Sequence, residues 1–473
     1  MSKKTVKQVA PFLILLGVAV AAIFVGPAAS FDPASVVNTD GTPKYIYNSG
    51  DIAWMLVSCA FVFLMTPALA FFYGGMVGRK NVIATMIKST VSVGVISVLW
   101  IVIQFSLCFG TSLGNVPGGH GGFIGDPRTF LFFKDVMNGE PWSLAATIPL
   151  PLFAFFQLMF AVITPGLVVG AVAERIRFSS YTLFIVLFGA LVYAPLAHMA
   201  WHPDGLMFKW GVQDFAGGTV VHISAGMAAL AGALVLKPRR STTATSPANI
   251  PYVLIGTGLL WFGWFGFNAG SAVGAGSLGV YAFATTNTAA AAAGLSWMFL
   301  DVMRGKKPSV LGFCIGAVVG LVAITPAAGF VGVPAALFIG FTAAIVSNLV
   351  AGFLKSKTKY DDPLDVFACH GIGGIVGMLM TGIFSTVKPG STALFPTQFP
   401  IQVVGMLLAV SFSFIASFII FKVINLILPM RVTQAEEADG LDSSQHDEKY
   451  LQGTLLVHNQ NGTVKEVPAS AEV

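Results

Sequence analysis

The chain has 473 residues, of which 55% are apolar and only 10% are charged. Soluble domains carry about 25% charged residues, so this composition excludes a soluble globular protein and predicts a polytopic protein embedded in membrane lipid. The formal net charge is +5, but the basic residues stand in short loops between apolar segments. The charge therefore predicts no nucleic-acid partner.

Residues 1–30 show the three parts of a secretory signal: lysines near the start, an apolar run over about 11–25, and small residues at 28–30. We predict a cleaved signal peptide, because the run is short for a membrane span. An uncleaved extra helix is the alternative. Both deliver residue 31 onward to the outer side of the membrane.

The rest of the chain alternates apolar runs with loops. A bilayer core of about 30 Å needs about 20 apolar residues per helix. Interruptions by Arg, Lys, Pro and Gly predict an all-α membrane domain over 31–430 with eleven transmembrane helices. Their expected ranges are 52–74, 82–110, 148–173, 180–200, 214–236, 252–275, 279–303, 309–327, 333–354, 363–386 and 401–430.

Basic residues divide unequally between the two sets of alternate loops. Most of them, from Arg79 to Arg431, fall in one set, and the opposite loops carry only Arg128, Lys134, Lys209 and Lys388. Cytoplasmic loops are the ones enriched in Lys and Arg. The pattern predicts that the first helix runs inward and that the C-terminal tail is cytoplasmic, an N-out/C-in topology.

Two histidines deep in apolar stretches are the most informative residues. His222 and His370 each lie eight residues after an aspartate, Asp214 and Asp362 respectively. They fall in the fifth and tenth predicted helices, which predicts a 5+5 inverted repeat plus a final helix. An ionisable residue inside a membrane helix is costly enough to indicate function. Two unrelated core histidines, each bonded to carbonyls, are the alternative.

Four segments carry a resemblance to a known family. They are FFYGGMVGRKNV (71–82), DFAGGTVVHISAGMAALAGALVLKPR (214–239), GWFGFNAGSA (263–272) and DDPLDVFACHGIGG (361–374). Over about 52–450 the chain resembles the ammonium transporter (Amt/Mep/Rh) family, Amt branch. The resemblance implies a multi-pass plasma-membrane homotrimer with one pore per protomer, which takes up ammonium or methylammonium without a cofactor.

The resemblance also assigns roles to residues. His222 and His370 match paired pore histidines that share a ring-nitrogen hydrogen bond. An external recruitment site for the cation matches Phe109, Trp201, Phe267 and Ser271, with Phe105 as a second gate ring beside Phe267 and Trp264 lining the conduit. Asp214 and Asp362 match structural acids, which we expect to cap helix N-termini. With 40 Phe in the chain, no single ring stands out without the family.

The chemistry of ammonium suits a histidine-lined pore. Its pKa is about 9, so deprotonation at pH 7 costs about 3 kcal/mol, whereas moving a bare ion into a dry medium costs on the order of tens of kcal/mol. An apolar pore with neutral imidazoles is therefore expected to conduct ammonia, with or without separate proton transfer, and to reject sodium and potassium.

The segment 431–473 is predicted to be an acidic cytoplasmic tail. GLDSSQHDEKY (440–450) resembles the family's ordered tail, which is linked to gating and to PII-type signal proteins, so such a protein is a candidate partner. Beyond Tyr450 the chain departs from the family. LLVHNQNGTVKEV alternates polar and apolar residues around Asn461 and Gly462, which predicts a hairpin, with a disordered extension as the alternative.

Two function classes remain besides transport. An ammonium sensor on the same fold is one alternative, but such a sensor would need a separate signalling partner. A membrane enzyme with histidine metal ligands is the other. The chain has no HExxH motif and no third ligand beside the histidine pair, so we predict neither a metal site nor enzyme activity.

Overall fold

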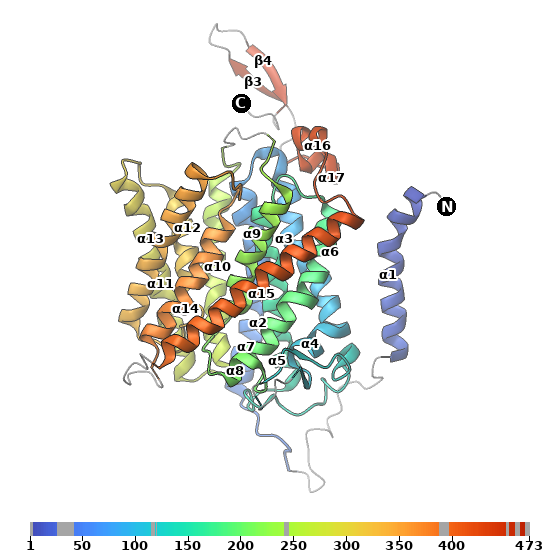
Figure 1. Cartoon of the computed structure of the whole chain (residues 1–473), viewed down its shortest axis with the longest axis vertical. Helices are drawn as coiled ribbons and strands as arrows, with labels where there is room; N and C mark the ends of the chain where they lie inside the picture. The colour runs from blue at the N-terminus through green and yellow to red at the C-terminus, as the bar shows by residue number, and fades with distance from the viewer. Residues whose placement is uncertain are drawn as a thin grey trace.

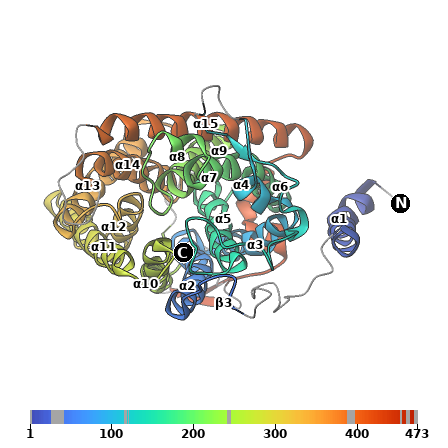
Figure 2. The same cartoon turned by 90° about the horizontal axis from the view of Figure 1, so that it is seen from below.

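The structure is a computed structural model, and it describes residues 3–25, 42–114, 119, 121–240, 246–386, 397–450, 454–458 and 464–468. Most of these residues form a bundle of roughly parallel helices, with small elements at its two ends (Figure 1). The three small residues of the predicted signal-peptide site, at 28–30, lie outside the described residues. The described helix α1 (Lys3–Val25) stands apart from the bundle in both views (Figures 1 and 2).

The first half of the bundle contains five helical segments. They are α2 (Ser49–Met76); η2 (Arg79–Asn81), α3 (Val82–Leu99), η3 (Trp100–Gln104) and α4 (Phe105–Phe109); α5 (Leu150–Val172); α6 (Phe178–Phe188), η5 (Gly189–Tyr193) and α7 (Ala194–Trp201); and η6 (Gly218–Ile223) with α9 (Ser224–Leu236). Connections between these helical segments hold the short elements β1 (Ser112–Leu113), β2 (Ile124–Gly125), η4 (Leu131–Phe133) and α8 (Leu206–Lys209).

The second half repeats this count and adds one helix. It comprises α10 (Ile250–Ala269) with η7 (Gly270–Ala272), α11 (Ser277–Met303), α12 (Val310–Ile324), α13 (Val333–Lys357), η8 (Phe367–Ile372) with α14 (Gly373–Phe384), and α15 (Gln398–Ile427). Each of the eleven predicted ranges falls on one of these segments. Within the described residues, nine are long and apolar enough to cross a membrane, and α11 and α12 are not among the nine. A multi-pass membrane protein is confirmed, while the number of crossings and their direction stay predictions.

The two histidine-bearing helices each begin with a π-helical turn. His222 lies in η6 and His370 lies in η8. π-Helical turns are rare in proteins, and those that occur often lie at functional sites. Gly217, just before η6, has a φ of 112°, which a residue with a side chain rarely adopts. Glycine therefore permits the abrupt start of the helix that carries His222.

Close helix crossings hold the two halves together. A Cβ atom added to Gly226 of α9 would lie 2.2 Å from the Gly371 nitrogen of η8, directly after His370. A Cβ added to Gly256 of α10 would lie 2.5 Å from the Phe72 nitrogen of α2. Small residues thus allow the backbones to touch, as in other membrane bundles. α15 then crosses obliquely over α6, α9 and α14 (Figures 1 and 2).

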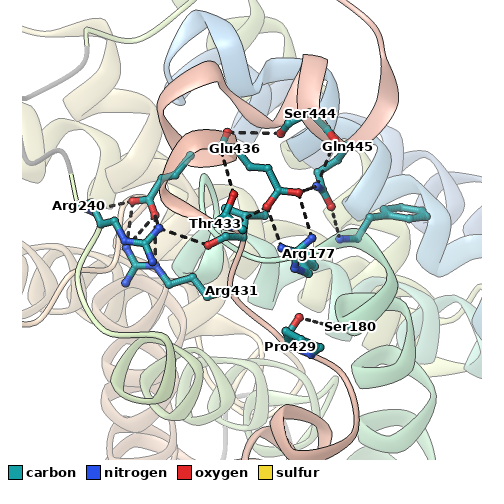
Figure 3. Close-up of polar contacts among 12 residues, drawn as sticks. Arg177, Ser180, Arg240, Pro429, Arg431, Thr433, Glu436, Ser444 and Gln445 are labelled. Carbon is teal, nitrogen blue, oxygen red and sulfur yellow. Dashed lines mark hydrogen bonds and ion pairs between the residues drawn. The ribbon is translucent and has the colours of Figure 1, made fainter. Parts of the chain in front are cut away.

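The tail folds against one end of the bundle through two short helices, α16 (Gln434–Asp439) and α17 (Leu441–His446) (Figure 1). Glu436 forms an ion pair with Arg177 at 2.8 Å. Glu437 pairs with Arg431 at 2.9 Å and with Arg240 at 3.3 Å (Figure 3). The tail is therefore attached to the loops that follow α5 and α9.

Beyond the tail helices, β3 (Thr454–His458) and β4 (Val464–Pro468) pair antiparallel (Figure 1). Leu456 lies opposite Glu466 in this ladder. The predicted hairpin is confirmed in its strands, and the alternative of a disordered extension is not supported for them. The expected turn at Asn461 and Gly462 lies outside the described residues.

Candidate functional site

The structure brings the two predicted pore histidines together at the centre of the bundle. Nδ1 of His222 lies 3.4 Å from Nδ1 of His370, and the ring planes are 28° apart. Both side chains are buried, at 1% and 3% exposure. One nitrogen donates and the other accepts, so the contact couples the tautomers of the two rings. Among the described residues, Nε2 of His222 has no hydrogen-bond partner.

A narrow apolar cavity of about 10 Å³ adjoins the histidine pair. Trp264 stacks on His222 with 5.3 Å between ring centroids, and its indole N–H donates to Thr325 Oγ1 at 3.0 Å. Apart from the two histidines the cavity is lined by Met65, Leu69, Phe72, Ile163, Leu167, Val221, Leu260, Trp264, Phe267 and Val318. The passage thus offers imidazole nitrogens and apolar surface.

A second, wider cavity of about 570 Å³ lies on the predicted outer side. Trp201, Ser271 and Phe109 line it, together with Asp214. The Trp201 indole N–H donates to the Asp214 carbonyl at 3.1 Å, and the Ser271 hydroxyl donates to the Phe267 carbonyl at 2.8 Å. Since that hydroxyl proton is engaged, the Ser271 oxygen is left with acceptor capacity.

Two phenylalanine rings separate the wide cavity from the narrow one. Phe160 lines the outer cavity and Phe267 lines the inner cavity, and their ring centroids are 4.3 Å apart. Both are buried, at 1% exposure. Phe160 also meets Trp201 edge to face at 5.9 Å. These two rings are therefore in contact where the lining of the outer cavity meets the lining of the histidine cavity.

The structure does not place Phe105 beside Phe267, where we predicted a second gate ring. Phe105 is fully buried in a ring cluster with Trp100, Phe109 and Phe130, and it lines neither cavity. The physical reason is its place in α4, where the helix end packs against the loop that holds Phe130. Phe109 does line the outer cavity, but its ring packs on neighbours other than Trp201.

Phe160 takes the place that the sequence assigned to Phe105, and sequence reasoning missed it. Phe156 and Phe160 are one helical turn apart in the sequence, and the structure shows that both line the outer cavity. The same spacing separates Phe105 and Phe109. Spacing alone therefore could not choose between the two pairs of rings.

Asp214 caps the helix that carries His222. Its carboxylate accepts hydrogen bonds from the backbone N–H groups of Gly217 at 2.9 Å, Gly218 at 2.6 Å and Thr219 at 2.8 Å, and from the Thr219 hydroxyl. Burial raises the pKa of Asp214, while these donors favour its charged form. The side chain is engaged with its own helix.

Asp362 has the corresponding place before the helix that carries His370. Its carboxylate accepts from the Phe367 N–H at 2.8 Å and from the Tyr360 hydroxyl at 3.3 Å. Burial, followed by the nearby charge of Asp365, raises the pKa of Asp362 to about 6. The two repeats thus fix their histidine helices in the same manner.

Comparison with known proteins decides the family. The model of the Ammonium Transporter Family matches residues 53–450. An ammonium transporter of Bacillus subtilis is 42% identical over 420 residues, which cover 86% of this chain and 99% of the relative. This chain belongs to the ammonium transporter family. Such relatives are transporters, in agreement with the prediction of a transport protein rather than an enzyme.

Solved structures of the ammonium transporter family share the fold. The crystal structure of Candida albicans Mep2 superposes with a TM-score of 0.76 at 33% identity, covering 83% of this chain and 88% of that one. A structure described as a sensor Amt protein gives 0.76 at 30% identity, covering 84% and 98%. Among the described residues of this family member, no three His, Cys, Asp or Glu side chains are grouped to hold a metal ion.

Proposed function

We propose that this protein recruits ammonium at the outer aromatic cavity, removes a proton, and conducts ammonia past the paired histidines. The observation that carries the proposal is the direct contact between His222 and His370 beside a narrow apolar passage. Family membership supplies the substrate class. The expected reaction is transport, with or without separate transfer of the proton.

Recruitment rests on ring faces and one hydroxyl. Trp201 and Phe160 meet at the floor of the outer cavity, and Ser271 lines its wall. An aromatic face attracts a cation by about 0.5–2 kcal/mol, and the Ser271 oxygen accepts an N–H from ammonium. These contacts replace part of the water that the cation leaves behind. Potassium gains the same attraction but has no proton to lose.

The apolar passage then selects for the neutral form. Burial of an unpaired cation among Val221, Leu260 and Val318 is far more costly than removal of one proton from ammonium. The two imidazoles provide hydrogen-bond partners to ammonia within this passage. His222 Nε2, which has no partner among the described residues, is available for that contact.

The experiment is uptake into proteoliposomes. We expect wild-type protein to take up methylammonium and to exclude potassium and sodium. His370→Ala is expected to remove the selective uptake while the protein remains folded, because the imidazole network is broken. Wild-type uptake together with intact ion exclusion in this variant would assign the histidines a purely structural role.

A sensor is the second candidate, favoured by the likeness to the structure described as a sensor Amt protein. A sensor that does not transport predicts ligand binding without uptake in the same proteoliposomes. The wide outer cavity and the narrow inner passage, whose linings meet at the Phe160–Phe267 contact, favour a transporter.

Further parts of the proposal concern assembly and location. We propose a homotrimer in the plasma membrane, with residues 431–473 in the cytoplasm and residues 1–30 removed as a signal peptide. The ordered tail helices α16 and α17 would then lie where a PII-type signal protein binds. Mass measurement of the mature protein in detergent tests both the trimer and the cleavage.

A further inference from the structure

The first turns of α15 carry two buried glutamines, Gln398 and Gln402, which are 7% and 0% exposed. The Gln402 side-chain amide binds both backbone groups of Gln213. Its Nε2 donates to the Gln213 carbonyl at 2.7 Å, and its Oε1 accepts from the Gln213 N–H at 2.6 Å. A single side chain thus satisfies a donor and an acceptor of a segment 189 positions away.

Gln398 supports the same arrangement. Its Nε2 donates to the Gly211 carbonyl at 2.9 Å and to Gln402 Oε1 at 3.2 Å. The Gln213 side chain is held separately, since its Oε1 accepts from the Ser385 hydroxyl. The irregular segment 211–213 therefore exchanges hydrogen bonds with α15 and the end of α14, while the N–H groups of Gly211 and Val212 donate to the Phe208 and Met207 carbonyls of α8. Backbone outside a regular helix needs such partners.

This segment leads directly into the outer cavity. Gly211, Gln213 and Asp214 all line that cavity. The Asp214 carbonyl accepts the Trp201 indole N–H at 3.1 Å, which fixes the plane of the Trp201 ring. A continuous series of contacts therefore runs from Gln402 through the Gln213 backbone and the next peptide to Trp201.

We propose that Gln402 is a positioning residue for cation recruitment, which it serves by fixing the segment that orients the Trp201 ring. The inference rests on the proposed function, and it assigns to α15 a part in substrate affinity. Gln402 touches neither cavity, so it acts through the backbone it holds. The paired histidines keep their own contacts without it.

Loss of the amide has a definite physical consequence. Replacement of Gln402 by methionine keeps the volume but leaves the partly buried N–H and C=O of Gln213 without their partners. The segment is then expected to shift toward water in the outer cavity. Trp201 would follow its hydrogen-bond acceptor, and the ring face would no longer be held at one orientation toward the cation.

The test compares three variants in proteoliposomes, with methylammonium as the probe. Gln402→Met is expected to raise the half-saturating concentration about fivefold, the factor for a net hydrogen bond of about 1 kcal/mol. The maximal rate per folded protein and the exclusion of potassium stay at wild type. Gln398→Met leaves both Gln402–Gln213 bonds in place, and we expect it to raise the half-saturating concentration about twofold. Ser413→Ala, at a buried position of the same helix, is expected to leave the half-saturating concentration unchanged.

The proposal is overturned if Gln402→Met keeps the wild-type half-saturating concentration. It is also overturned if this variant loses maximal rate about fivefold while its half-saturating concentration stays unchanged. If Gln402→Met does not assemble, Gln398→Met provides the test. A wild-type half-saturating concentration in Gln398→Met then overturns the proposal. Trp201→Leu separates this inference from the proposed function. An effect of Trp201→Leu without one of Gln402→Met refutes only the positioning role, whereas no effect of Trp201→Leu refutes recruitment itself.

Discussion

At the scale of single residues, the proposed selectivity depends on which side chains remain available after the structural hydrogen bonds are made. Asp214 is engaged by four donors of its own helix start. The Ser271 hydroxyl donates a hydrogen bond to the Phe267 carbonyl, so its oxygen can only accept from the substrate. The proposal therefore assigns affinity to the ring faces and the Ser271 oxygen of the outer cavity, and selection to the imidazole nitrogens.

The first prediction at this scale concerns Trp201. Loss of one cation–π contact of about 1 kcal/mol in Trp201→Leu should raise the half-saturating methylammonium concentration roughly fivefold and change the maximal rate little. Ser271→Ala should act in the same direction. Phe109→Ala serves as the comparison, because the Phe109 ring packs on four other rings, those of Trp100, Phe105, Trp142 and Phe153. A pure steric gate predicts instead an unchanged half-saturating concentration with higher flux in Trp201→Leu.

The second prediction concerns the pH dependence of stability. The pKa of Asp362 is raised to about 6 in the folded protein, above the ordinary value of about 3.9. The folded state therefore binds the proton more tightly, and this carboxyl's contribution to stability declines as pH rises from about 4 to about 6. Asp362→Asn should remove that decline. Thermal unfolding in detergent at pH 4, 5, 6 and 7 measures it, and parallel curves for the two proteins would contradict the assignment.

At the scale of elements, the distance between the two histidines depends on how closely α9 and η8 approach. Gly226 lies against the backbone of Gly371, one residue beyond His370. The π-turns η6 and η8 then present both rings to the same point. The helix crossing is therefore part of the site, although no glycine atom touches the substrate.

The corresponding prediction compares two glycines in helices. Gly226→Ala places a Cβ 2.2 Å from the Gly371 nitrogen, so the helices must separate and the histidine contact must lengthen. Gly258→Ala, where a Cβ meets no atom within 4 Å, is the matched control. We expect Gly226→Ala to lower both thermal stability and methylammonium uptake, with the control at wild type or slightly more stable. Equal behaviour of the two variants would refute the importance of this crossing.

At the scale of the whole molecule, hydropathy predicted the helical segments, and the paired Asp–His spacing predicted an inverted repeat. The contact between His222 and His370 was expected from the resemblance to the ammonium transporter family. The contact of Phe160 with Phe267 could not be predicted, because Phe105 and Phe160 have the same local spacing and differ only in tertiary surroundings. The π-turns and the amide of Gln402 depend on contacts across the fold, for which one sequence gives no periodic signal.

The predicted topology has its own test. Cysteines at Leu144 and Lys209 are expected to react with an impermeant thiol reagent added outside the cell, because both positions are exposed on the predicted outer side. Cysteines at Lys307 and Lys357, which are exposed at the other end, should react only after the membrane is opened. The unmodified chain is the control for its four native cysteines. Labelling of both pairs from one side would contradict the N-out/C-in arrangement.

The central claim is that the passage admits ammonia because it contains neutral imidazoles and apolar surface. Potassium flux through His222→Asp tests it most directly, since the substitution offers an anion to a bare cation in the passage. In proteoliposomes with a potassium gradient, we predict no flux for wild type and measurable potassium flux for His222→Asp, with His222→Ala as the uncharged control. The account is contradicted if the His222→Asp protein folds, transports methylammonium and still excludes potassium as the wild type does.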